Sequence, residues 1–375
     1  MEVYVKECSA MNLNTIKPWL KKTIDIKPFI SLDAVKINDI VVISNTEDDD
    51  FYNNLSDYNI LVYEEFSEKI ISNISQEFQY NYDYYYLKNA LSAAADPNIT
   101  SIISGSSYGS FGIETSLLTN AVNLSLISQD LYYSLEGIYY TCSKNRNIKN
   151  IVLCVGYYYF FADLSKTQNT GEIQRVSKVY DPLYGDKHNC YLLPPPPANV
   201  LYKSDVFDIQ NILDIYTQKE CIKGYFHNQR PRKTFATKEW NDKSKEWYQL
   251  SINEKEEAAK RRASLHNKSI KRENSLLENV ELFQDFLKFC DSEKINLLLV
   301  VTPSTPYYLN CLLPDYKSIF YDFLNEVDGV IHLLDLAEDT RFSDEDFNDT
   351  DHLNEKGAQK LTQIILNTLQ EMNNS

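Results

Sequence analysis

Two largely apolar runs, Ile151–Gly156 and Ile295–Val301, constrain the fold of this chain more than any other sequence feature. A strand has such a run when sheet neighbours and helices cover it on both faces, so that no side of it meets water. Shorter candidate strands lie at Ser101–Ser104, Val122–Leu126 and Val330–Leu334. The order strand, helix, strand favours right-handed crossovers, and we therefore predict an α/β protein with a parallel sheet.

Helices are expected between these strands and after the last one, at Glu64–Ala95, Gln129–Cys142, Asn279–Asp291 and Glu355–Glu371. We divide the 375 residues into a small N-terminal α/β or β-rich segment, residues 1–65, and a larger domain, residues 66–375. The pattern of the larger domain breaks down at about 163–247, where Pro194–Pro197 excludes helix. We interpret this stretch as an irregular insertion or lid. The charged residues from Lys238 to Lys271 predict an exposed helix.

Composition excludes several classes of partner. The net charge of -16 argues against nucleic acid and against anionic membrane surfaces, because both require concentrated Lys and Arg. We expect no membrane span, since no stretch approaches the roughly 20 apolar residues that one needs. Seven scattered cysteines without a C-x-x-C motif predict a reduced, cytoplasmic protein with no metal site. The phosphate-binding motif G-x-x-x-x-G-K-[S/T] is absent, and we expect no cofactor.

A candidate nucleophile lies directly after the first strand of the larger domain. Three of the ten glycines, Gly105, Gly109 and Gly112, surround Ser107 in a G-x-S-x-G frame. Such a turn exposes a hydroxyl at the carboxyl edge of a parallel sheet, where ligands bind. Ser104 and Ser106 are rival serines, and a simple glycine-rich turn is the alternative interpretation.

A candidate base and its orienting carboxylate precede the last predicted helix. A serine needs a base to take its proton, and His352 lies in a polar loop with Asp349 three residues before it. Asp349 can accept the Nδ1–H of the imidazole, which leaves Nε2 facing the serine. Asp351 is the competing orienting residue, and a solvated histidine on an acidic loop is the alternative.

These blocks resemble the SGNH/GDSL hydrolase superfamily over roughly residues 66–375. Gly105–Tyr108 resembles its first block, and Asp349–His352 resembles its last block, D-x-x-H. The pattern Ser-Ser-x-x-x-x-Gly-Ile, followed by Asn123–Ser125 and Gln129–Leu131, is most similar to one branch. That branch includes the teichoic acid D-alanylation protein and alginate acetyltransferase-like proteins. The resemblance implies a flavodoxin-like parallel sheet flanked by helices and an acyl-serine intermediate.

The sequence departs from the superfamily at the groups that would bind the oxyanion. The second block usually offers a glycine N–H, but this chain has Ser128 there, and the third block lacks the usual asparagine. We take the N–H groups of Ser107 and Ser128 as the oxyanion donors. Gln129, Tyr108 and Tyr157 are further candidates for oxyanion or substrate binding.

Together these features predict a serine esterase or O-acyltransferase with Ser107, Asp349 and His352 as its triad. The resemblance implies a substrate with an acyl group, often acetyl, on a carbohydrate or polysaccharide precursor. The G-x-S-x-G frame also fits an α/β-hydrolase, although the acid and histidine of that fold come from separate loops. A non-catalytic glycan-binding or scaffold protein with the same fold is the alternative function, favoured by the missing asparagine.

Overall fold

A computed structural model of the protein describes residues 2–8, 11–36, 38–44, 58–64, 83–190, 206, 208 and 245–374. The chain forms two compact units, the first of Met1–Tyr82 with Pro195–Lys219 and the second of Asp83–Pro194 with Glu220–Ser375. The predicted boundary after residue 65 is therefore wrong, because the first unit extends to residue 82 and takes in a later segment. Two backbone hydrogen bonds tie that segment to the first unit, from Lys21 N–H to Val206 O (3.0 Å) and from Asp208 N–H to Trp19 O (2.8 Å).

The first unit contains an all-parallel sheet with the strand order β2-β1-β3-β4. Its elements are β1 (Glu2–Val5), α1 (Leu13–Ile16), β2 (Asp25–Pro28), β3 (Ile40–Ile43) and β4 (Asn59–Val62), with 3₁₀ turns at Lys17–Trp19 and Leu32–Ala34. Tyr4, Val35, Val41 and Ile43 form its buried cluster. The unit is thus a small parallel α/β piece.

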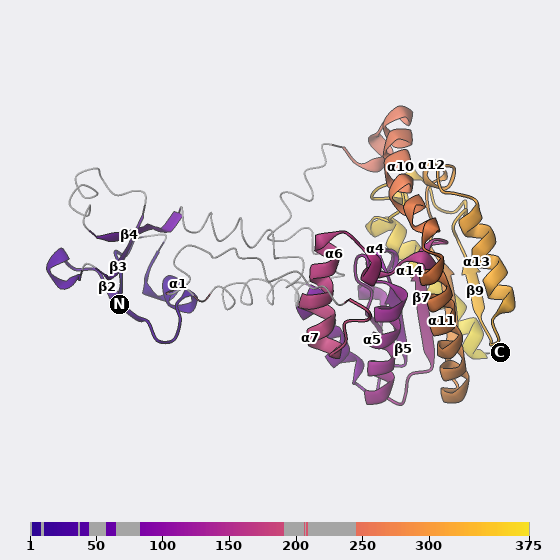
Figure 1. Ribbon diagram of the computed structural model, residues 1–375, viewed down its shortest axis with the longest axis horizontal. Coiled ribbons are helices and arrows are strands. Elements are labelled where there is room, and N and C mark those ends of the chain that lie inside the picture. Colours follow the sequence, from indigo (N-terminus) through magenta and orange to yellow (C-terminus); the bar gives the residue numbers. More distant parts are fainter. Residues whose placement is uncertain are drawn as a thin grey trace. The chain divides into compact units, whose positions relative to one another are not determined.

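The second unit is built on a five-stranded parallel sheet (Figure 1). Its strands are β5 (Ser101–Gly105), β6 (Ala121–Asn123), β7 (Asn150–Val155), β8 (Asn296–Val301) and β9 (His332–Asp335). The order β6-β5-β7-β8-β9 is the 2-1-3-4-5 order of flavodoxin-like folds. The predicted flavodoxin-like α/β fold is confirmed, and all five predicted strands lie within two residues of their expected starts.

Helices connect and cover these strands. They are a helix at residues 83–94, α4 (Ser107–Gly112), α5 (Leu131–Lys144), α10 (Ile252–Asn267), α11 (Glu273–Glu293), α12 (Pro306–Leu309), α13 (Asp315–Glu326) and α14 (Glu355–Asn374). Helix α14 buries Leu361, Ile365 and Leu369, four residues apart and therefore on one face. These side chains pack against alternate residues of the sheet, including Val152 and Leu298. Each fully buried aliphatic side chain contributes about 1.5–3 kcal/mol.

The predicted irregular insertion is only partly irregular. Residues 163–190 belong to the second unit and contain α6 (Thr170–Arg175), a π-helical turn (Val176–Tyr180) and α7 (Asp181–Tyr184). A buried ion pair of 2.9 Å from Arg175 Nε to Asp83 joins this segment to the helix at 83–94. Most of residues 191–244, including the four prolines, lie outside the described residues.

Helix α10 is also less exposed than its charge predicts. Lys255, Ala259 and Ala263 are buried at intervals of four residues, so one face of α10 packs on the protein. The two alanines are small enough to let this helix approach its neighbour α12. Among the described residues, no helix combines the length and the apolarity needed to cross a bilayer.

Gly105 is expected to be essential for folding, because it has a φ of +130° and its α-carbon lies against β7. A β-carbon at this position would come 2.2 Å from the carbonyl oxygen of Cys154. We expect Gly105→Ala to lower the free energy of unfolding by about 3 kcal/mol or more, measured by urea denaturation. Gly185→Ala is the matched control, since Gly185 has a φ of +72° but open space around it. That change is expected to cost about 1–2 kcal/mol, and equal losses in both variants would contradict the steric argument.

Candidate active site

Ser107 lies at the first position of α4, immediately after the strand β5. The Ser106 side chain caps the helix by accepting from Tyr108 N–H, and α4 packs on α14 through Gly112 and Leu361. Gly109 allows a second close approach, because a β-carbon there would meet the Ser125 hydroxyl at 2.1 Å. The sequence thus holds the Ser107 hydroxyl at the carboxyl edge of the sheet.

Asp349 and His352 lie in a tight loop that precedes α14. An antiparallel bridge between Phe347 and Leu353 closes the loop, and both side chains are buried. The Asp349 carboxylate accepts the backbone N–H groups of Asp351 (3.1 Å) and His352 (2.9 Å). The loop therefore holds the carboxylate next to the ring of the histidine that follows it.

The three predicted triad residues form one hydrogen-bonded chain. The Nε2 atom of His352 lies 2.9 Å from Ser107 Oγ, and both oxygens of Asp349 lie 3.0 Å from His352 Nδ1. Because a carboxylate only accepts hydrogen bonds, the ring proton resides on Nδ1 and Nε2 presents its lone pair to the serine. This is the geometry in which a histidine can take a proton from a serine.

The carboxyl group of Asp349 is held in its ionised form. Burial alone raises the pKa of this carboxyl, but the charge of His352 and its hydrogen bond outweigh burial, and the pKa falls well below its ordinary value. Asp349 consequently remains a carboxylate across the pH range in which a histidine titrates.

Asp351, the alternative orienting carboxylate, has Arg262 as its main partner and not the imidazole of His352. Both its oxygens accept from Arg262 Nε, at 3.0 and 3.1 Å, and Oδ2 also accepts from the Tyr108 hydroxyl at 3.1 Å. Its Oδ1 lies 3.7 Å from His352 Nδ1, farther than either oxygen of Asp349. The structure thus distinguishes Asp349 as the carboxylate that orients the imidazole.

Two backbone N–H groups are free to bind an oxyanion. Those of Ser107 and Ser128 donate to no acceptor among the described residues. Ser128 has a φ of +57°, in the left-handed region that favours glycine.

The other predicted binding residues do not lie where the reacting atoms would be. Gln129 is buried, and its Nε2 donates to Gly105 O, Leu124 O and the Ser134 hydroxyl, so its amide supports the framework. Oxyanion or substrate binding by Gln129 stays a prediction.

The two predicted tyrosines are also committed to other contacts. Tyr108 is buried, and its hydroxyl supports Asp351 from behind the triad. The Tyr157 hydroxyl donates to Asp335 Oδ2 (2.7 Å), and its ring lines a separate hollow of about 410 Å³. The sequence could not predict which way these two side chains point, because a tyrosine after a strand can turn towards either neighbouring element.

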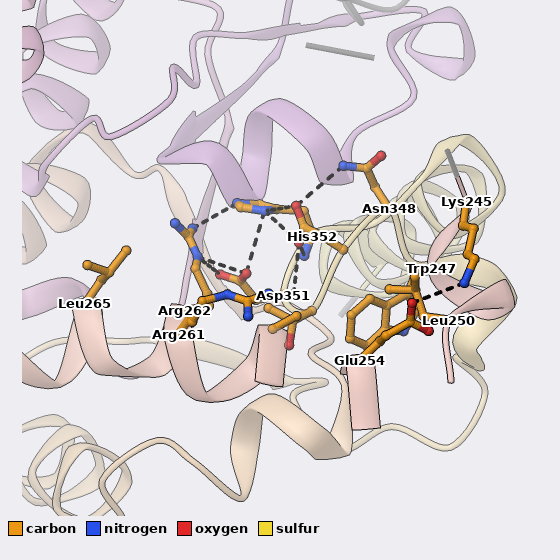
Figure 2. Close-up of a pocket in the computed structure, with 13 residues that line it drawn as sticks. Lys245, Trp247, Leu250, Glu254, Arg261, Arg262, Leu265, Asn348, Asp351 and His352 are labelled. Atoms are coloured by element: carbon orange, nitrogen blue, oxygen red, sulfur yellow. Dashed lines mark hydrogen bonds and ion pairs between the residues drawn. The ribbon is translucent and has the colours of Figure 1, made fainter. Parts of the chain in front are cut away.

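A cavity of about 650 Å³ opens beside the triad (Figure 2). Residues 348–352 form one wall, and α10 with the turn before it forms the other. The second wall presents apolar, basic and acidic side chains, namely Trp247, Leu250, Ala258, Leu265, Lys245, Arg261, Arg262 and Glu254. Substrate can thus approach His352 along α10.

Arg262 is a residue of this site that sequence reasoning missed. It is one of many charged residues in α10, and nothing in its sequence neighbours distinguishes it. His266, one turn further along α10, is partly buried, stacks on Tyr158 at 3.9 Å and contacts the Tyr308 hydroxyl. Burial, and then the charge of Arg262, lower the pKa of His266 well below its ordinary value, so His266 remains neutral.

Two groups of side chains have the spacing of metal ligands within the described residues. One is Asp349, Asp351 and His352, where the cation of Arg262 already pairs with Asp351. The other is Asp130, Asp163 and His188. Asp130 accepts the N–H groups of Tyr133 and Leu164 and thereby caps α5, while burial raises its pKa to about 6. We assign a metal to neither group.

Comparisons with known proteins add little to this geometry. One family model, for a domain of unknown function, matches residues 244–374, which is less than half of the chain. No curated protein matches. One similar solved structure is described as "a putative platelet activating factor from Streptococcus pneumonia". It has 10% sequence identity and a TM-score of 0.36, and the match covers 81% of this chain and 99% of that one.

Proposed function

We propose that this protein is a serine esterase or O-acyltransferase of the SGNH type, with Ser107, His352 and Asp349 as its catalytic triad. The observation that carries the proposal is the 2.9 Å contact between Ser107 Oγ and His352 Nε2, which joins residues 245 positions apart. Asp349 on Nδ1 completes the arrangement. A serine, a histidine and a carboxylate hydrogen-bonded in this order are the requirements of acyl transfer.

The reaction follows from the positions of these atoms. His352 takes the Ser107 proton as Oγ attacks the acyl carbon, and it then gives that proton to the departing alcohol. Water or a second alcohol next loses its proton to His352, attacks the acyl-serine and releases Oγ, which regains the proton. The free N–H groups of Ser107 and Ser128 would bind the oxyanion of each tetrahedral intermediate.

The proposed substrate is an acyl ester of a carbohydrate, with acetyl as the expected acyl group. This part of the proposal is supported by the sequence resemblance, and the cavity beside the triad, lined by apolar and charged side chains, is where such a substrate would bind. Hydrolysis and transfer share every step up to the acyl-enzyme. The cytoplasmic location remains a prediction from the cysteine pattern.

Labelling with a fluorophosphonate probe, read by mass spectrometry of the intact and digested protein, tests the proposal. We expect one adduct on the peptide that contains Ser107 and a labelling rate at least about 100-fold lower in His352→Ala, because general base catalysis supplies about this factor. His332→Ala is the matched control, since His332 lies in β9 and has no contact with the triad. Absence of an adduct on the wild type, or equal labelling of His352→Ala, would overturn the proposal.

A non-catalytic binding or scaffold protein is the second candidate. The observation that favours it is the burial of Ser107, which is only 6% exposed. An enzyme with this site needs α10 or the loop 347–353 to yield slightly when substrate enters. The labelling experiment separates the two candidates, because a scaffold with an occluded serine forms no adduct.

A further inference from the structure

The guanidinium of Arg262 lies at the reactive edge of the imidazole (Figure 2). Its Nε donates to both oxygens of Asp351, and its Nη2 lies 3.4 Å from His352 Nε2. The Arg262 side chain is 32% exposed and lines the cavity beside the triad. A cation therefore stands next to the nitrogen that would exchange protons with Ser107 and with the substrate.

The position of Nε2 defines where the substrate oxygen must be. In acyl transfer, Nε2 first takes the serine proton and then gives it to the departing oxygen, which must come within about 2.6–3.2 Å of Nε2. Ser107 Oγ occupies one side of Nε2 at 2.9 Å, and Arg262 Nη2 occupies another at 3.4 Å. An oxygen within hydrogen-bonding distance of Nε2 on the cavity side can thus also reach Nη2.

Arg262 has donors to spare for this oxygen. A guanidinium carries five N–H groups. One of them binds Asp351 and one points towards His352, while the remaining three donate to no other group among the described residues. The contact with Nε2 is long and can be exchanged for a shorter hydrogen bond to a substrate oxygen.

The charge of Arg262 persists through the reaction. Burial lowers its pKa, but the neighbouring carboxylate of Asp351 more than compensates, so its pKa is raised above the ordinary value. Arg262 therefore donates hydrogen bonds and takes no part in proton transfer.

We propose that Arg262 is a further catalytic residue, whose Nη2 donates a hydrogen bond to the substrate oxygen that leaves, or attacks, the acyl carbon on Ser107. In acylation the bond from carbon to Oγ forms first and gives the tetrahedral intermediate, and the bond from carbon to this oxygen then breaks as the oxygen receives the proton from Nε2. In deacylation the same site holds the oxygen of water or of the acceptor alcohol, which loses its proton to Nε2. The inference rests on the proposed acyl-serine function.

The experiment measures kcat/KM for a series of acetate esters whose leaving groups differ in basicity. The series runs from 4-nitrophenyl acetate, whose leaving group is a stable anion, through phenyl acetate to trifluoroethyl acetate. For Arg262→Gln we expect about a 100-fold loss with trifluoroethyl acetate, which is typical for the removal of one charge-stabilising donor. The loss with 4-nitrophenyl acetate should be within about threefold, because that leaving group needs little stabilisation.

Two further variants make the result specific. Arg262→Lys retains the charge without the planar set of donors. The change of kcat/KM with leaving-group basicity in this variant should therefore lie between those of the wild type and Arg262→Gln. Arg262→Lys also provides the test if Arg262→Gln does not fold. Lys260→Gln is the matched control, since Lys260 lies on the same helix, is 68% exposed, pairs only loosely with Glu256 at 3.9 Å and does not line the cavity. Its kinetics should equal those of the wild type with every ester.

Two outcomes would overturn the inference, and a third would overturn the proposed function. An equal loss of kcat/KM with every ester in Arg262→Gln would show that Arg262 only positions Asp351 or His352. Wild-type activity in both Arg262 variants would show that the guanidinium does not contact the reacting oxygen. A wild type that neither hydrolyses any ester nor reacts with the fluorophosphonate would instead overturn the proposed function on which the inference depends.

Discussion

Ser107→Ala is expected to lower ester hydrolysis by on the order of 10⁶-fold, as loss of the nucleophile does in triad enzymes. The thermal stability of this variant should remain close to that of the wild type. The reason is that, among the described residues, the hydroxyl makes one side-chain hydrogen bond, with His352 Nε2, and its loss removes only one atom and its hydrogen. Initial rates with 4-nitrophenyl acetate and a thermal melt measure both quantities.

Ser106→Ala is the control for this result. Ser106 was the rival serine of the sequence, and in the structure its side chain caps α4. We expect Ser106→Ala to lose about 1 kcal/mol of stability but to keep its reaction with the fluorophosphonate. Hydrolysis that survives in Ser107→Ala and disappears in Ser106→Ala would contradict our choice of nucleophile.

Asp349→Asn is expected to lower kcat by about 10⁴-fold without a comparable loss of stability. An amide in place of the carboxylate can stabilise the wrong imidazole tautomer, in which Nε2 carries the proton and cannot accept one from Ser107. Asp349 is a partly exposed loop residue, so this substitution leaves the core intact. Rates measured from pH 5 to 9 should be depressed throughout, because Asp349 is ionised over that whole range in the wild type.

Asp351→Asn provides the comparison, because Asp351 is the second carboxylate near the imidazole. Its side chain is fully buried and pairs with Arg262. We expect this variant to lose about 2 kcal/mol of stability, since it leaves a half-buried cation without its counter-charge, and to lose less activity than Asp349→Asn. A larger loss of kcat in Asp351→Asn than in Asp349→Asn would reverse the roles that the distances assign.

The arrangement of the second unit could be predicted from local features of the sequence. Largely apolar runs such as Ile295–Val301 are found where both faces of a strand are covered, and their alternation with amphipathic helices implies parallel crossovers. The start of α14 and the G-x-S-x-G turn are likewise local signals, because caps and glycine turns depend on neighbouring residues. These signals predicted a parallel α/β sheet, whereas the flavodoxin-like form of that sheet was implied by the resemblance to the SGNH/GDSL superfamily.

Domain limits were predicted less well. The first unit includes a segment beyond residue 194, and no pattern within that segment indicates a return of the chain. Residues 163–190 were expected to be irregular but contain short helices, which tertiary contacts such as the pair Arg175–Asp83 stabilise. Short helices of this kind have weak periodicity, because burial of one face and not intrinsic propensity stabilises them.

The sequence by itself determined which residues can carry the proposed chemistry: a serine in a glycine turn after a strand, and a carboxylate three residues before a histidine. Both features are defined by residue types at fixed spacing along the chain, which can be read directly from the sequence. Only the tertiary structure decided which groups meet around them. It placed Arg262 on the cavity side of Nε2, and it turned Gln129 and Tyr157 away from the reacting atoms. The reason is that a side chain's direction in space depends on how whole helices and strands pack, and residues many positions apart determine that packing together.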